Sequence, residues 1–467
     1  MAVKKKSLLQ EELRGCDYMD ILANGSKSNI FKSNSMIDYS YKTGITIMDY
    51  VYGYELNVFD GEDFIKKRKV LGIQAGSFNV ITGRTQAFKT TITTKIAANI
   101  AFANGGNVYH YDTENRAVEQ RIRHLTKLPN SWFDGEHPRY KVMCGAFTFD
   151  QLIEDIAELY ENKMRNKELL LKDTGEVDSR NKPIKLMPPT LIIIDSLQNI
   201  VVKDYDIETT KDDLNKLRSN TQGARSAYTI RGFITDILPM LKEANIVVLC
   251  IAHKTTNMTL QAYGGVKKQF QYGSADERIS GGSAVEFNAS SVINMTGITS
   301  PDSRFHMQTD GFEGNTVLFE PTKSSTNASG NDKEGLGFEI IIDKGSEGVD
   351  NVRTLIRFMY NRGRLKGNKA GYTVIGDDGE LVGNKFTWKN VHKEFREDKE
   401  TERAFFKACF TELNKLIAKA DEESQGSIQV FDIDNYLSED NTNEIASCNK
   451  YMCGIEAVEY LFSEEIA

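Results

Sequence analysis

One segment of this chain has the residue types and spacing to hold phosphate groups. It starts at Gly83 and ends at Lys89-Thr90, between an apolar run and a segment of helical period. A loop of this kind directs backbone N–H groups and the positive end of a helix dipole at an anion. We expect Lys89 to reach the β- and γ-phosphates of ATP and Thr90 to bind Mg²⁺. The predicted nucleotide contacts here are Gly83, Arg84, Thr85, Gln86, Ala87, Phe88, Lys89, Thr90 and Thr91.

Phe88 departs from the usual form of this motif. The motif reads G-x-x-x-x-G-K-[ST], and Phe88 occupies the position of its second glycine. Taken alone, the segment could also be an ordinary turn with a surface lysine. Polar residues further along the chain, each at the end of an apolar run, favour the phosphate-binding interpretation.

Four residues at the ends of predicted strands could act on a bound nucleotide. Asp195 could hold the Mg²⁺ shell through water, or could cap a turn. Glu114 or Asp112 could orient and deprotonate the attacking water, and the residues alone do not separate these two. His253 could contact the γ-phosphate and transmit its presence to the following loop, although a lone histidine is often structural.

The elements that would position these residues form an α/β pattern. Short runs rich in Val and Ile alternate with segments of helical period, which predicts a mainly parallel sheet covered by helices on both faces. The predicted strands are 78–81, 108–111, 191–194, 246–251, 291–295 and 338–342, and helices are predicted at 91–104 and 228–244.

Composition predicts three parts along the chain. Residues 1–40 form a polar N-terminal arm, residues 41–365 the α/β core, and residues 366–467 a small α+β domain with an acidic tail. Within the core, residues 163–188 are expected to be a surface insertion, and the glycine-rich residues 254–282 a long loop. In the last part, a strand is predicted at 372–375, a turn at 377–379 and helices at 388–395 and 402–420.

Bulk properties set few limits on function. The net charge of the 467 residues is −8, which neither indicates nor excludes nucleic-acid binding, because DNA contact needs only a local basic surface. The six cysteines form no CxxC pair and the closest two have no histidine beside them, so a zinc site is not expected. We find no secretory signal and no apolar run of the roughly 20 residues that a bilayer requires, and we therefore expect a cytoplasmic protein.

Ordered sequence blocks resemble the RecA family, and within it the recombinases of T4-like phages. The blocks are Thr43–Asp49, Gly83–Thr90, Tyr111–Glu114, Ile194–Leu197, Ile251–His253 and Gly281–Ala284, and the resemblance covers roughly residues 40–365. Phenylalanine in place of the second glycine is itself a mark of the phage subfamily. The resemblance favours Glu114 over Asp112 as the catalytic carboxylate.

The resemblance implies two further nucleotide contacts. The family places an aromatic ring on the adenine seven residues after the catalytic glutamate. Here that position is Arg121, whose planar guanidinium could stack instead, or which could be a solvated helix residue. The family also sends basic residues across the subunit interface to the neighbour's γ-phosphate. Lys344 lies in the matching region and is the candidate for that role, with Arg353 as a basic residue further on.

The resemblance also implies that residues 254–282 hold DNA. Basic side chains can track phosphates, and aromatic side chains can stack on bases. The candidates are Lys254, Tyr263, Lys267, Lys268, Phe270, Tyr272 and Arg278, with Gly281 and Gly282 closing the loop. A first DNA loop is expected at about residues 203–225, although its mixed charges would equally suit a solvated helix face.

The function implied is ATP- and Mg²⁺-dependent DNA strand exchange in homologous recombination and repair. Subunits with a RecA-type P-loop core, associating through the N-terminal arm, would form helical filaments on single-stranded DNA and pair it with duplex DNA. Mediator and single-strand-binding proteins would be partners, in the cytoplasm of a phage-infected bacterium. The alternatives are a hexameric replicative helicase with the same core and a regulatory filament protein without strand exchange.

Overall fold

The computed structural model describes residues 38–61, 63–201, 221–256, 277–279, 283–298, 314–325, 337–343, 348–368 and 370–417. The predicted N-terminal arm up to residue 37, the acidic tail from residue 418 and residues 203–220 of the first DNA loop lie outside these residues. Residues 221–225, the end of that predicted loop, belong instead to the helix α9 (Thr221–Ala244). Among the described residues, no helix combines the length and apolar character needed to cross a membrane.

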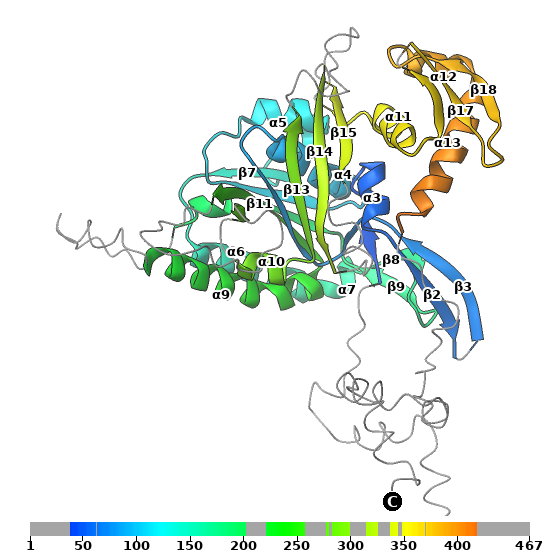
Figure 1. The fold of residues 1–467 in the computed structure, drawn as a ribbon. Helices are drawn as coiled ribbons and strands as arrows, with labels where there is room; N and C mark the ends of the chain where they lie inside the picture. The colour runs from blue at the N-terminus through cyan, green and yellow to red at the C-terminus, as the bar shows by residue number, and fades with distance from the viewer. Residues whose placement is uncertain are drawn as a thin grey trace, which may run out of the picture.

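A sheet of nine strands forms the centre of the molecule (Figure 1). Eight strands follow one another in the order β15-β14-β13-β5-β11-β10-β6-β7, and β12 pairs with an extension of β11. Their bounds are β5 (Phe78–Gly83), β6 (Asn107–Asp112), β7 (Tyr140–Cys144), β10 (Thr190–Asp195), β11 (Ile246–Thr256), β12 (Glu277–Ile279), β13 (Ser291–Ile298), β14 (Gly314–Ser324) and β15 (Phe338–Asp343).

The pairing confirms the predicted α/β class with a mainly parallel sheet. The six strands from β13 to β7 in this order pair in parallel, whereas β14 runs antiparallel to both β13 and β15. Each of the six predicted strands is present. The edge strand β7 and the strand β14 were not predicted from the sequence.

Helices cover both faces of the sheet (Figure 1). Leu191 and Ile193 of β10 pack in the same hydrophobic cluster as α4, and the alternate residues Ile192 and Ile194 pack with α6 and α9. Both faces of this strand are therefore buried, which explains its continuous apolar sequence. The helices of this part are α3 (Thr46–Val51), α4 (Lys89–Ala103), α5 (Glu119–Thr126), α6 (Phe149–Arg165), α7 (Lys167–Leu170), α9 (Thr221–Ala244), α10 (Ser283–Asn288) and α11 (Asn351–Asn361).

Two β-hairpins lie beside the sheet (Figure 1). They are β2 (Tyr54–Asp60) with β3 (Asp63–Val70), and β8 (Lys172–Val177) with β9 (Pro183–Leu186). The backbone N–H of Phe59 donates to Ser179 O at 2.9 Å and joins the two hairpins. The second hairpin lies within the predicted surface insertion, but the insertion is narrower than predicted, because Lys163 belongs to α6 and is buried, as is Met187. A small ladder joins β1 (Ser40–Tyr41) to β4 (Ile73–Gln74).

The C-terminal part of the described chain is a three-stranded antiparallel sheet with two helices. Its elements are β16 (Leu365–Asn368), β17 (Gly371–Ile375), β18 (Leu381–Phe386), α12 (Val391–Glu397) and α13 (Lys399–Asn414). Trp388 is buried beside α11, where the guanidinium of Arg357 lies 4.9 Å from its ring centroid. The hydrophobic cluster on the α4 face of the central sheet continues into this part without interruption.

Candidate nucleotide-binding site

The candidate phosphate loop leaves the sheet from the end of β5, between β11 and β13. Gly83 pairs with His253 on one side and with Met295 on the other. Its φ is +151°, and a Cβ built at this position would lie 2.1 Å from Met295 O. Only glycine fits here, because any side chain would collide with the neighbouring backbone.

The structure gives a physical account of Phe88. This residue has φ +58° and ψ +22°, the left-handed conformation, immediately before α4 begins. Glycine adopts that conformation without steric cost, whereas other residues pay for it. The Phe88 side chain packs against the large hydrophobic cluster, and this burial offsets the conformational cost. The backbone shape that the motif needs is therefore present without the second glycine.

Lys89 is held inside the loop. Its ammonium donates to Gly83 O at 2.9 Å and to Arg84 O at 2.8 Å, and the residue is 6% exposed. Burial lowers the pKa of Lys89, while the charges of Asp195 and Glu114 act in the opposite direction. Arg84, Thr85 and Gln86 form the exposed crest of the loop, and Ala87 and Thr91 are buried below it.

Thr90 and Asp195 meet at the candidate metal position. The Thr90 hydroxyl donates to Asp195 Oδ2 at 2.6 Å. Asp195 ends β10 and is buried. Burial raises the pKa of Asp195, the Thr90 hydrogen bond lowers it, and the negative charges of Glu114 and Asp112 raise it again.

A hydroxyl and a carboxylate placed in this way suit Mg²⁺, which proteins commonly bind through one or two side chains together with substrate phosphates. Within the described residues, no group of three or more His, Cys, Asp or Glu side chains could hold a metal ion by itself. The local excess of carboxylates around Asp195 is the kind of charge that a divalent cation would offset. These donors therefore fit an ATP–Mg²⁺ complex.

Both carboxylate oxygens of Glu114 have polar partners. His253 Nε2 donates to Oε1 at 3.0 Å, and Ser196 Oγ donates to the same atom at 3.2 Å. Arg116 Nη1 lies 3.1 Å from Oε2. Burial alone would raise the pKa of Glu114, but the hydrogen bonds from His253 and Ser196 and the charge of Arg116 outweigh it and hold that pKa below its usual range.

Asp112, the rival carboxylate, has a different role. Its Oδ1 accepts from the Glu114 N–H at 3.0 Å and its Oδ2 from the Ala117 N–H at 2.5 Å. Asp112 is 2% exposed, and both of its oxygens hold the turn that carries Glu114. The geometry thus favours Glu114 as the residue that can meet a water molecule, and assigns Asp112 to the support of the turn.

Ser196 contacts Glu114 but was not predicted from the sequence as a site residue. Ser196 follows Asp195, and the peptide bond between them is cis. The Thr113 hydroxyl donates to Ser196 O at 2.9 Å and accepts from the Ser196 N–H at 2.8 Å. These bonds tie the end of β10 to the turn after β6. The adjacency of Ser196 to Asp195 was visible in the sequence, but its contact with Glu114 depends on the pairing of the two strands.

Arg121, the predicted adenine contact, lies with an exposed side chain in the first turn of α5, whose Ile122 and Leu125 are buried. Lys344, the predicted interface residue, lies outside the described residues.

Of the predicted DNA-binding residues, Lys254 and Arg278 lie in strands. The expected loop at 254–282 was too wide, because β11 continues to Thr256 and pairs antiparallel with β12, which places Arg278 opposite Thr255. The buried Ile279 anchors this extension. The remaining candidates, Tyr263, Lys267, Lys268, Phe270, Tyr272, Gly281 and Gly282, lie outside the described residues.

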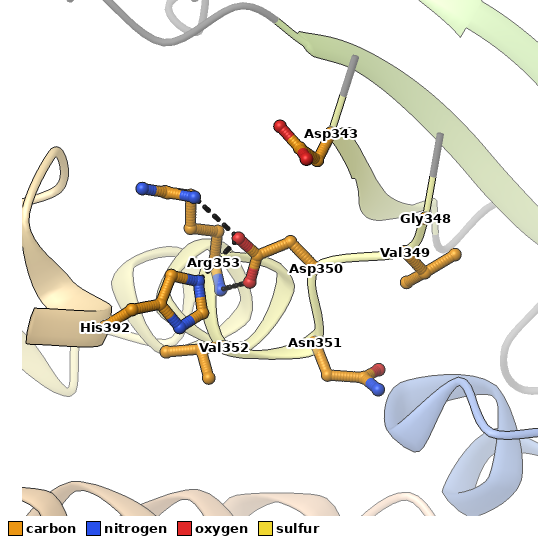
Figure 2. A pocket seen from close by; sticks show the side chains of 8 residues that line it. All are labelled: Asp343, Gly348, Val349, Asp350, Asn351, Val352, Arg353 and His392. Carbon is orange, nitrogen blue, oxygen red and sulfur yellow. Dashed lines mark hydrogen bonds and ion pairs between the residues drawn. The ribbon is translucent and has the colours of Figure 1, made fainter. Parts of the chain in front are cut away.

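A second polar cluster lies at the same edge of the sheet, at the end of β15, which is three strands away from β5. A cavity of about 350 Å³ lies between the end of β15 and α12 (Figure 2). Asp350 dominates its polar contacts, accepting from Arg353 Nη1 at 2.7 Å and His392 Nε2 at 2.8 Å. Asp350 also accepts from the Arg353 N–H and caps α11. These bonds join α11 to α12, so we interpret the cluster as structural.

Comparison with protein-family models gave no match for this chain, and a search of curated proteins gave no similar sequence.

Proposed function

We propose that this chain is a DNA-dependent ATPase with a RecA-type core, which exchanges DNA strands as a helical filament on single-stranded DNA. One observation carries the proposal. Four adjacent strands, β5, β11, β10 and β6, bring together Lys89 and Thr90 after β5, His253 in β11, Asp195 at the end of β10 and Glu114 after β6. Thr90 bonds to Asp195 there, and His253 bonds to Glu114. Ligands of open α/β sheets bind at this carboxyl edge.

Binding of the nucleotide would use the loop after β5. Lys89 exchanges its two carbonyl acceptors for phosphate oxygens, which are better acceptors because they carry charge. Phe88 has no side-chain oxygen to cap α4, so the first N–H groups of the helix are available to an anion. Thr90 and Asp195 would hold Mg²⁺, which neutralises charge that develops on the phosphates.

Hydrolysis would depend on Glu114. Its carboxylate orients a water molecule and accepts a proton from it as the water oxygen bonds to the γ-phosphorus and the bond to the β-phosphate oxygen breaks. Glu114 is suited to this role because it is ionised and partly accessible, with a side chain 18% exposed. His253 fixes the position of one carboxylate oxygen.

β11 provides a short connection between this chemistry and DNA. His253 contacts Glu114, and the next three residues of the same strand, Lys254 to Thr256, lead into the segment proposed to hold DNA. Gln198, in the turn after β10, donates to His253 O at 3.4 Å. A change in that segment would be transmitted to the base through a single strand rather than through a flexible linker.

Strand exchange tests the proposal directly. The purified chain, with ATP and Mg²⁺, should convert circular single-stranded DNA and homologous linear duplex into joint molecules, and Lys89→Ala should not. Electron microscopy of the same reactions should show filaments. Failure to form joint molecules with homologous DNA would contradict the proposal, and closed rings in place of filaments would point to a hexameric helicase.

A further inference from the structure

Arg116 makes a contact that the proposed reaction does not use. It lies in the turn between β6 and α5, two residues after Glu114. Its side chain is 79% exposed, yet Nη1 lies 3.1 Å from Glu114 Oε2. The other oxygen of Glu114 accepts from His253 and Ser196. Arg116 is thus the contact to the second oxygen of the candidate base.

The turn itself places Arg116 over Glu114. Asp112 accepts from the N–H groups of Glu114 and Ala117, which closes the turn around Arg116. Asn115, between Glu114 and Arg116, has φ +54°, in the left-handed region. The Thr113 N–H donates to Asp195 O at 2.8 Å and fixes the turn to β10. The turn is thus fixed to the sheet, and Arg116 is the most exposed of the three residues that contact Glu114.

An arginine on this oxygen opposes general-base chemistry. A base must take a proton from water, and a guanidinium beside the carboxylate stabilises its ionised form and so lowers its basicity. His253 and Ser196 already engage Oε1, so Oε2 is the oxygen with more room for water, and Arg116 lies beside it. Removal of the guanidinium charge would therefore make Glu114 a stronger base.

We propose that Arg116 is a positioning residue that restrains Glu114 and keeps hydrolysis slow without DNA. This inference rests on the proposed function, because it concerns the base of that reaction. The restraint involves no covalent change, since it acts through the charge of the arginine beside Oε2. The restraint acts on the chemical step, so it lowers kcat and leaves the KM for ATP unchanged.

The test is steady-state ATP hydrolysis without DNA. Arg116→Ala should raise basal kcat by about two- to fivefold, the size expected for loss of a largely exposed ion pair, with KM unchanged. Arg116→Lys keeps the charge without the planar fork and should stay near the natural rate. Arg165→Ala, at the exposed end of α6, is the matched control and should change nothing. With Glu114→Gln already present, Arg116→Ala should have no further effect.

The outcomes separate the two proposals. If hydrolysis requires Lys89 and Glu114 but Arg116→Ala leaves the basal rate unchanged or lowers it, the restraint is wrong and the ATPase proposal stands. A rise in KM with unchanged kcat would also overturn the restraint, because it would place Arg116 in nucleotide binding. If no variant shows hydrolysis that depends on Lys89, both proposals fail.

Discussion

Phe88 offers a test of the loop conformation that is independent of activity. Phe88→Ala and Phe88→Gly both remove the ring that packs against the hydrophobic cluster, and they differ only in a Cβ. At φ +58° that Cβ costs about 1 kcal/mol or slightly more, because left-handed backbone is unfavourable for residues other than glycine. Phe88→Gly should therefore be the more stable of the two by about 1 kcal/mol.

The assay is equilibrium unfolding in urea, followed by circular dichroism, for both variants and the natural chain. Ala103→Gly, at an exposed position at the end of the same helix, is the matched control and should lose up to about 1 kcal/mol, because ordinary helical backbone favours alanine. Equal stability of the two Phe88 variants, or greater stability of Phe88→Ala, would refute the left-handed conformation at the phosphate loop.

Three further changes have definite expected outcomes. Gly83→Ala should cost about 2 kcal/mol or more in unfolding free energy, measured in urea, because its Cβ would overlap Met295 O; near-natural stability would contradict the pairing of β5 with β13. Glu114→Gln should retain binding of a fluorescent ATP analogue but lose roughly 100-fold or more in turnover; undiminished turnover would remove Glu114 as the base. Lys163 should make stability rise with pH. Burial lowers its pKa to about 7, so above that pH the unfolded chain binds the extra proton, and stability increases by up to about 1.4 kcal/mol per pH unit until the ordinary lysine pKa is reached. The free energy of unfolding, measured in urea, should increase less from pH 7 to pH 9 for Lys163→Met than for the natural chain. Equal increases would show that Lys163 is not the source of this pH dependence.

The parts of the fold that the sequence predicts are those in which local pattern and tertiary environment agree. β5 and β10 are buried along their whole length, so their apolar runs stand out. β7 lies at the sheet edge, where Tyr140 alone of its five residues is fully buried, and β14 carries Pro321 within a mixed sequence. β3 presents several lysines to solvent. Such strands depend on neighbours that a linear pattern does not reveal.

The candidate site shows the same division. Lys89, Thr90 and Asp195 could be proposed as site residues from the sequence, because the loop motif and the ends of apolar runs are recognised from neighbouring residues alone. The choice between Asp112 and Glu114 depends on which carboxylate accepts backbone N–H groups from the turn. The contacts of Ser196 and Arg116 with Glu114 depend on strand order and turn geometry, which no spacing rule supplies.

ATP hydrolysis with and without single-stranded DNA tests the central proposal most directly. The natural chain should hydrolyse ATP faster when DNA is present, and Lys89→Ala should abolish that activity because it removes the ammonium from the phosphate loop. Lys172→Ala, an exposed lysine on β8, should behave like the natural chain. Hydrolysis that survives Lys89→Ala, or that is indifferent to DNA, would contradict a DNA-dependent ATPase built on this loop.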